Sequence, residues 1–149
     1  MLRVAAADPA SLEALGLIAR LDAALSAITG DSGASSFDPR DVQGFDAAFV
    51  IAWNAHGEAV GCGAFRKLEG DVAELKRMYA RPGSGAGVCL LADLERRAAA
   101  CGYRRLWLST RRVNTRAVDF YQRHGYAPVA PWGRYVGREV SVCLGRRLG

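Results

Sequence analysis

The sequence predicts an α+β fold, a mixed and mostly antiparallel central sheet flanked by helices. Three apolar segments follow one another between residues 47 and 79 and are separated only by short turn sequences, which is typical of an antiparallel meander. Beyond them, helical segments alternate with short apolar segments, so one later strand should run parallel to its neighbour through a right-handed crossover. A length of 149 residues favours one domain, which we assign to residues 1–149.

The first expected elements are a short strand and a long helix. Residues 2–6 form a short apolar run. Asp8 followed by Pro9 is a helix-start signal, because the Asp8 carboxylate can cap the first turn and proline fits the first helical position. Apolar residues then recur every three or four positions as far as residue 28, and Gly30 should end the helix.

Residues 31–44 form the least regular segment. Their sequence, DSGASSFDPRDVQG, is rich in Ser, Gly, Asp and Pro, which predicts a loop with one short helical turn near Pro39. Long loops are typically either functional or disordered. Two interpretations therefore stand side by side, a flexible connector and a lip over a substrate site.

The predicted meander consists of residues 47–53, 58–66 and 72–79. The sequence NAHG supplies the first tight turn and EGD the second. A glycine-rich segment, RPGSGAG, occupies residues 81–87 and opens a helix that Gly102 should terminate.

The last part of the chain predicts three more strands and one helix. Residues 104–109 should form the parallel strand, because a helix separates them from the meander. Asn114 can cap a helix over residues 115–124, which Gly125 closes. The final two strands are expected over residues 126–130 and 139–146.

The net charge is +5 and comes from arginine, which is concentrated after Tyr103. A polyanionic ligand would be attracted to that half of the chain, although a solvated basic face accounts for most of these side chains. The sequence lacks the aromatic platform typical of nucleic-acid binders, so we expect no nucleic-acid partner. The opposing hypothesis, in which an aminoacyl-tRNA is bound, predicts RNA affinity that falls steeply with salt.

The cysteines and the hydropathy pattern indicate a cytoplasmic protein. Four cysteines show neither disulfide-like nor metal-like spacing, which predicts small buried side chains in a reducing compartment and no metal site. Asp8, Pro9 and Glu13 interrupt any apolar leader, and no apolar run is long enough to span a bilayer. We therefore expect no membrane partner.

The glycine-rich segment is a candidate anion site. Gly83, Gly85 and Gly87 let the backbone approach phosphate oxygens closely, and the helix that follows adds partial positive charge at its N-terminus. A nucleotide-binding P-loop would require Gly-Lys-Ser/Thr, whereas Val88 and Cys89 follow here. The alternative is a plain glycine-rich turn.

The chain resembles the GNAT N-acetyltransferase superfamily. The resemblance rests on ELKRMY before the glycine segment, LL in the helix after it and AVDFYQRHGY two elements later; it covers nearly the whole chain and is strongest over residues 73–126. It implies direct transfer of an acetyl group from acetyl-CoA, as cosubstrate, to a primary amine, which is a small molecule or a peptide. It also allows a homodimer.

The resemblance implies three groups of cofactor-binding residues. The pantetheine arm would pair with the strand backbone, the pyrophosphate would lie on the glycine segment, and the next helix would contact the arm. These residues are Met78, Tyr79 and Ala80; Arg81, Gly83, Ser84, Gly85, Ala86 and Gly87; and Asn114 and Ala117. Pro82 departs from the family pattern, since a basic or amide residue is usual there, and Arg81 is the candidate substitute.

Two residues are candidates for proton transfer. Tyr121 resembles the family's general acid, which protonates the departing thiolate; its alternative is a core aromatic residue. Glu74 is the candidate general base, and its alternative is a salt bridge with Lys76 or Arg77. Strand alternation should place Glu74, Lys76 and Met78 on one face, with the residues between them on the other.

The acceptor site is the least defined part of the prediction. Trp132 and Tyr135 lie in an aromatic, glycine-containing segment between the last two strands and are candidates for its walls, or else they cover the core. The competing function is a non-catalytic acyl-CoA-binding or regulatory module of the same fold, which Pro82 favours and Tyr121 opposes.

Overall fold

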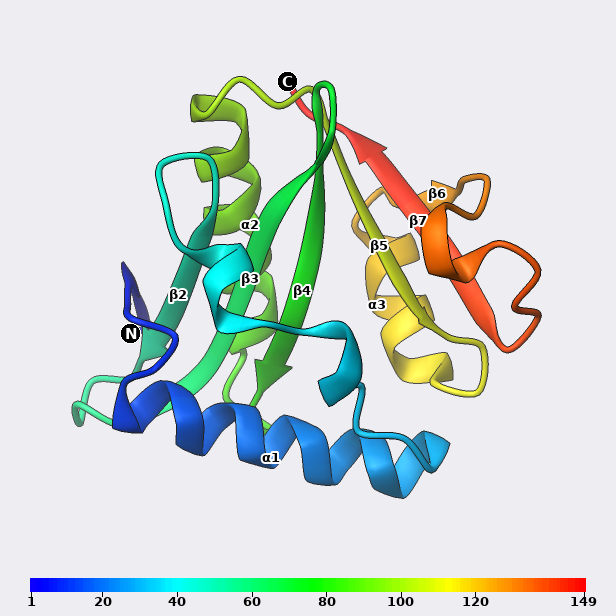
Figure 1. Cartoon of the computed structure of the whole chain (residues 1–149). Helices are drawn as coiled ribbons and strands as arrows, with labels where there is room; N and C mark the ends of the chain where they lie inside the picture. Colours follow the sequence, from blue (N-terminus) through cyan, green and yellow to red (C-terminus); the bar gives the residue numbers. More distant parts are fainter.

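The computed structural model describes the backbone of all 149 residues and every side chain except that of Ser36. Within these residues, seven strands form one open sheet in the order β1-β2-β3-β4-β5-β7-β6, and every neighbouring pair is antiparallel except β4 and β5 (Figure 1). The strands are β1 (Arg3–Ala6), β2 (Ala48–Trp53), β3 (Ala59–Glu69), β4 (Val72–Ala80), β5 (Arg105–Arg111), β6 (Ala127–Pro128) and β7 (Ser141–Arg147). The predicted α+β fold with a mixed, mostly antiparallel sheet is confirmed.

Helices cover both faces of the sheet (Figure 1). They are α1 (Leu12–Thr29), α2 (Ala86–Ala100) and α3 (Thr115–Arg123), with short 3₁₀ turns η1 (Ala34–Ser36), η2 (Pro39–Val42) and η3 (Gly133–Tyr135). One buried cluster, which includes Phe65 and Leu90, joins the sheet to α2 and α3. A smaller cluster around Phe49 and Ile51 joins the opposite face to α1. No described helix is both long and apolar enough to cross a bilayer.

The start of α1 differs from the prediction. A turn closed by the Ser11 N–H and the Asp8 carbonyl, 3.0 Å apart, keeps Asp8 outside the helix, and its carboxylate accepts a hydrogen bond from the Ala10 N–H instead. Ser11 is the N-cap, since its Oγ accepts from the Ala14 N–H. At the other end Gly30, with φ of 80°, ends the helix as expected.

Strand β4 contains a bulge that the sequence did not indicate. Cys62 pairs with Tyr79 but Ala64 pairs with Lys76, so two residues of β4 lie opposite Gly63. One of them, Arg77, has φ of 54°, the left-handed region that non-glycine residues rarely adopt.

The bulge overturns the predicted alternation along β4. Met78 does not share a face with Glu74 and Lys76; it packs against the cluster beneath α2. Arg77 turns toward α1, where its guanidinium pairs with Asp22. Since the extra residue reverses the face of every later side chain, a strict period of two fails at this point.

Strands β4 and β5 pair along only part of their length. Their parallel register covers Val72 to Glu74 and Arg105 to Trp107, and beyond Glu74 the two strands separate (Figure 1). The separation opens the middle of the sheet. It lies beside the bulge, so the irregular part of β4 faces the opening.

The cysteines differ in exposure. Cys62 and Cys143 are buried, as expected, whereas Cys89 and Cys101 are exposed, so the prediction that all four are buried is wrong for two of them. Both exposed residues lie on the outward side of α2 or at its end, where helical periodicity places them away from the sheet.

We expect two thiols to react quickly with Ellman's reagent in the native protein and the other two only after unfolding. Burial raises the pKa of the Cys62 thiol to about 12, which suppresses the reactive thiolate at neutral pH. A variant carrying Cys89→Ser and Cys101→Ser should show no fast phase. Four equally fast thiols would contradict the described burial.

Candidate active site

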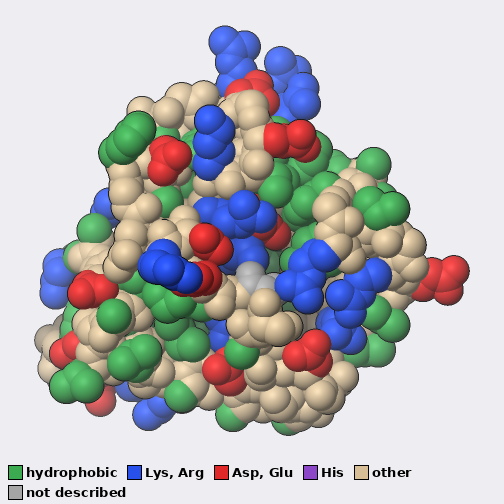
Figure 2. All heavy atoms as spheres, viewed as in Figure 1, with side chains coloured by type: hydrophobic (Ala, Val, Ile, Leu, Met, Phe, Trp, Pro, Cys, Tyr) green, Lys and Arg blue, Asp and Glu red, His purple; other side chains and the backbone are tan. Residues whose placement is uncertain are grey.

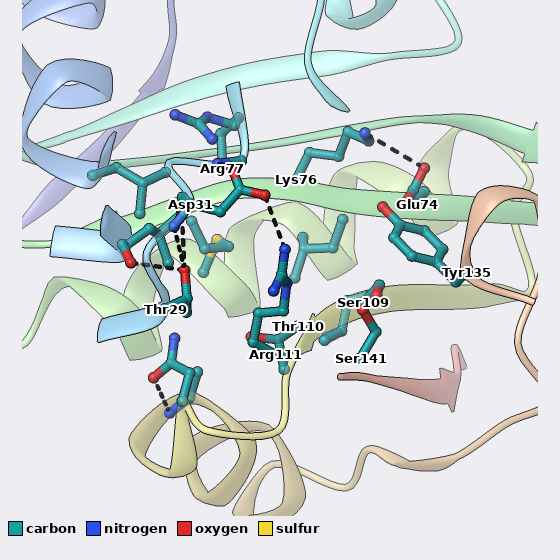
Figure 3. A pocket seen from close by; sticks show the side chains of 18 of the residues that line it. Thr29, Asp31, Glu74, Lys76, Arg77, Ser109, Thr110, Arg111, Tyr135 and Ser141 are labelled. Atoms are coloured by element: carbon teal, nitrogen blue, oxygen red, sulfur yellow. Dashed lines mark hydrogen bonds and ion pairs between the residues drawn. The ribbon is translucent and has the colours of Figure 1, made fainter. Parts of the chain in front are cut away.

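A cavity of about 230 Å³ occupies the opening between β4 and β5 (Figure 3). It is bounded from both faces of the sheet. Its lining includes residues 74–78 of β4, residues 108–111 of β5, Asn114, Ala117 and Tyr121 of α3, and Leu21, Leu25 and Thr29 of α1. Because α1 and α3 lie on opposite faces, the cavity connects the two sides of the sheet.

A second cavity of about 600 Å³ adjoins the first on the face of η1. Both are lined by Ser35, Glu74, Lys76, Arg134 and Tyr135. The second alone also contacts residues 37, 38, 41, 66, 68, 132 and 133. The segment 31–44 therefore forms a wall of both cavities, which supports its interpretation as a lip over a site.

Tyr121 enters the first cavity from α3. Its ring is 8% exposed and packs edge-on against Phe120 and Tyr126, with ring centroids 5.2 and 5.6 Å away. Burial raises the pKa of the Tyr121 phenol, so the hydroxyl keeps its proton at neutral pH. Tyr121 is thus both a packed aromatic residue and a protonated donor at the cavity wall.

The N-terminal turn of α3 also faces the cavity. Asn114 is the N-cap as predicted, and its Oδ1 accepts from the Ala117 N–H at 3.3 Å. This bond fixes the Asn114 side chain, and both residues line the cavity that Tyr121 lines. The spacing of two helical turns between Asn114 and Tyr121 is what places them along one wall.

Glu74 enters from β4 and is only 2% exposed. Its Oε1 accepts from the Arg66 Nε at 2.9 Å and lies 2.8 Å from the Arg66 Nη2 and 3.9 Å from the Lys76 Nζ. The salt-bridge alternative is therefore present in the structure, with Arg66 as the principal partner and not Arg77. These contacts all use Oε1.

Two further titratable groups lie beside Glu74. The Lys76 side chain is 10% exposed, and burial lowers the pKa of its ammonium, an effect that the charge of Glu74 opposes. Tyr135 points toward Glu74 (Figure 3), and burial followed by the Glu74 charge raises the pKa of its phenol. Tyr135, predicted as a wall of the acceptor site, lines both cavities.

Arg77 fixes the bulge to the surrounding segments. Its side chain is 5% exposed, forms an ion pair with Asp22 of α1 and donates from Nη1 to the Ser32 carbonyl at 3.3 Å. The guanidinium carbon lies 5.5 Å from the centre of the Phe37 ring. Its Nε is buried with no described partner. The strained residue thus connects β4, α1 and the segment 31–44.

The glycine segment lies outside the two cavities. Gly83 and Gly85 have φ of 78° and 73°, and Gly85 is the N-cap of α2 without a side-chain hydrogen bond. A Cβ on Gly87 would lie 3.3 Å from the Phe120 ring, so a larger residue there would require the ring to shift by a few tenths of an ångström. Arg81, the candidate substitute for Pro82, forms a long ion pair of 3.7 Å with Glu58.

The predicted residues therefore fall into two groups. The first cavity brings together Glu74, Met78, Asn114, Ala117, Tyr121 and Tyr135, while Trp132 lines the second. The remaining predicted cofactor residues, numbered 79–81 and 83–87, line neither cavity. Trp132 packs at a tilt against Trp107 and edge-on against Tyr135, with ring centroids 5.4 Å apart in each pair, so it covers the sheet as well as the cavity.

Sequence reasoning missed most of the charged lining. The missed side chains are those of Asp31, Asp38, Asp41, Arg66, Arg111, Arg134 and Arg138. The excess of arginine in the second half was a signal for some of them, but it did not show which guanidinium groups face a cavity. Among the described residues, no cluster of three His, Cys, Asp or Glu side chains could hold a metal ion.

Comparison with known proteins identifies the family to which this fold and this site belong. Residues 21–126 match the model of the Acetyltransferase (GNAT) family, and the chain belongs to that family. It is similar to the IAA acetyltransferase of Azospirillum brasilense, with 33% identity over 107 residues, which are 69% of each protein. The family resemblance seen in the sequence is thereby confirmed.

Solved structures agree with this assignment. A Klebsiella pneumoniae protein provisionally named an acyl-CoA N-acyltransferase matches all of this chain and 99% of its own at a TM-score of 0.84 and 30% identity. The PaiA N-acetyltransferase of Thermoplasma acidophilum, solved in complex with coenzyme A, matches 99% of both chains at a TM-score of 0.73 and 18% identity. The latter identity shows a shared fold alone.

Proposed function

We propose that this chain transfers the acetyl group of acetyl-CoA directly to the nitrogen of a primary amine. One observation carries the proposal. The opening between β4 and β5 connects the two faces of the sheet and places Tyr121 on the wall formed by α3 and Glu74 on the wall formed by β4. A thioester and an amine that enter from opposite faces would meet between these residues.

Acetyl-CoA is the donor that this arrangement suits. The separation of β4 beyond Glu74 leaves the backbone around Met78, Tyr79 and Ala80 without a neighbouring strand on the β5 side, so an extended pantetheine arm could pair there. The glycine segment and the N-terminus of α2 would receive the pyrophosphate, since small residues and helix N–H groups suit phosphate oxygens. Arg81 would add positive charge nearby.

The reaction requires two proton transfers. The amine nitrogen forms a bond to the acetyl carbon and loses a proton, while the bond from carbon to sulfur breaks and the thiolate gains one. The protonated Tyr121 phenol would donate to the thiolate. A backbone N–H of β4 near the bulge would polarise the thioester carbonyl.

Glu74 is the proposed acceptor of the amine proton. Its described contacts use Oε1, so Oε2 is left to receive the proton directly or through a water molecule. Burial keeps this carboxylate away from bulk solvent, and Arg66 holds it in place.

Glu74→Gln is expected to lower kcat/KM for the amine about 10-fold at neutral pH. The deficit should shrink as pH rises, because more of the amine is then already neutral. Steady-state kinetics between pH 6 and 10 would measure this, with Glu69→Gln as a control at an exposed position of β3. An equal loss at every pH would assign Glu74 a structural role.

Calorimetric titration tests the donor site. Acetyl-CoA and CoA should bind, whereas ATP, which lacks the pantetheine arm, should bind much more weakly. If neither CoA compound binds, Pro82 and the short glycine segment have removed the pyrophosphate site and the enzyme proposal fails.

A second candidate function is a non-catalytic acyl-CoA-binding module. The ion pair of Glu74 with Arg66 favours it, because a carboxylate already held by a guanidinium group could be purely structural. That function predicts acetyl-CoA binding without acetyl transfer to any amine of a broad panel.

A further inference from the structure

The first cavity, between β4 and β5, carries an excess of positive charge on the face of α1. Its described lining contains five cationic side chains and two carboxylates. The carboxylates are already paired, Glu74 with Arg66 at 2.8 Å and Asp31 with Arg111 at 2.9 Å. Figure 2 shows Lys and Arg side chains gathered near the centre of this face.

Among the described side chains that line the first cavity, Arg134 and Arg138 are the cations without a carboxylate partner. Both belong to the segment around η3, both line the first cavity and, among the described side chains, neither forms an ion pair. Arg134 also lines the second cavity, so it lies where the two cavities meet.

The charges of these two arginines affect the pKa values of groups on both sides of the site. Both help to hold the pKa of Asp31 low, after the Gly33 N–H and Arg111. Arg134 also contributes to the lowered pKa of Lys76. The two guanidinium groups therefore influence Asp31 in the segment 31–44 on one side of the site, and Arg134 also influences Lys76 of β4 on the other.

This charge distribution discriminates between classes of amine. A purely cationic amine would approach several like charges and would be repelled. An amine that also carries a carboxylate would offset the charge, because guanidinium and carboxylate form paired, charge-assisted hydrogen bonds. The positive surroundings would also favour the neutral, nucleophilic form of its amino group.

We propose that the acceptor is a small amino acid-like molecule whose carboxylate is bound by Arg134 and Arg138 while its amino group faces Glu74. This inference rests on the proposed acetyltransferase function. The first cavity has room for the reacting groups, and the second, with Trp132 on its wall, receives the rest of the molecule.

The test compares matched pairs of acceptors that differ only in the carboxylate. Phenylalanine against phenethylamine and leucine against isopentylamine are suitable, with release of the CoA thiol and the mass of the product as readouts. We expect kcat/KM to be at least about 10-fold higher for the amino acid of each pair. Equal rates, or faster reaction of the simple amines, would overturn the inference and leave the acetyltransferase proposal intact.

Arg134→Gln should reduce the preference for the carboxylate about 10-fold and leave CoA affinity unchanged. Arg147→Gln is the matched control, since Arg147 is exposed on β7, lines neither cavity and should change nothing. A preference that survives Arg134→Gln and Arg138→Gln together would contradict the assigned binding site.

A binding measurement decides the inference even if no amine is acetylated. Calorimetry would compare N-acetylphenylalanine with N-acetylphenethylamine on the CoA-loaded protein. Tighter binding of the carboxylate compound, lost in Arg134→Gln, supports the carboxylate site at Arg134 and Arg138, while an absence of turnover counts against the enzyme proposal alone. Equal or absent binding of the two compounds overturns the inference itself.

Discussion

Tyr121→Phe is expected to lower kcat about 100-fold while the affinity for CoA stays unchanged. The substitution removes only the hydroxyl, so the ring can keep its edge-on contacts with Phe120 and Tyr126. Without the phenolic proton, the thiolate must leave as an anion or take a proton from water. Steady-state kinetics and calorimetry with CoA would separate the two effects.

The direction of the pKa shift determines the protonation state of Tyr121 at neutral pH. Because burial disfavours the phenolate, the hydroxyl remains protonated across the neutral range. The wild-type rate should therefore not fall in that range through loss of this proton. Because the raised pKa also makes the phenol a weaker acid, the proton must move to sulfur as the carbon–sulfur bond breaks, in one concerted step.

Tyr126→Phe is the matched control for this experiment. Tyr126 is also buried, but its hydroxyl donates to Glu95 at 2.8 Å and it lines neither cavity. Loss of this hydrogen bond should lower the free energy of unfolding by about 1 kcal/mol without changing kcat. If Tyr121→Phe retains the wild-type kcat, another group or solvent protonates the thiolate and the assigned mechanism is wrong.

Asp22→Asn is expected to lower the free energy of unfolding by about 2 kcal/mol. Asp22 is the carboxylate partner of Arg77, whose side chain is 5% exposed, so the substitution leaves a buried guanidinium without its counter-charge. The expected loss is below that of a fully buried pair because Asp22 itself is 31% exposed. Thermal unfolding should show Tm lower by about 4–8 °C.

The same substitution should affect the site. Arg77 also holds the Ser32 carbonyl and contacts Phe37, so loosening it frees the segment 31–44 and the bulge of β4. We expect KM for the amine to rise more than kcat falls. Arg40→Gln, which removes the exposed pair with Asp38, should leave the free energy of unfolding almost unchanged. Equal losses in the two variants would mean that burial of Arg77 does not matter.

Much of the fold could be predicted because its signals are local. Gly30 and Asn114 mark helix ends through their own backbone preference or side-chain hydrogen bond, which does not depend on distant residues. Asp8 shows the limit of such signals. Asp8 and Ser11, three positions apart, can both cap a turn, and a tight turn before the helix makes Ser11 the N-cap.

The candidate site was predictable only in part. Tyr121 and Asn114 were found because one helix face brings together residues seven apart. The faces of β4 were assigned wrongly from Arg77 onward, since a bulge depends on the register of a partner strand rather than on the bulged sequence. Nothing in the local sequence marks Gly63 as the residue opposite two others.

The sequence by itself determined the order of the elements, the helix that carries Tyr121 and the membership of the GNAT family. Only the tertiary structure decided which charges face the cavity. Arg66 holds Glu74 across neighbouring strands, Arg111 reaches Asp31, and Arg134 comes from a turn beyond α3. Such contacts join different elements of the fold. Their geometry is fixed by the register of the sheet and the separation of β4 from β5, which no local pattern encodes.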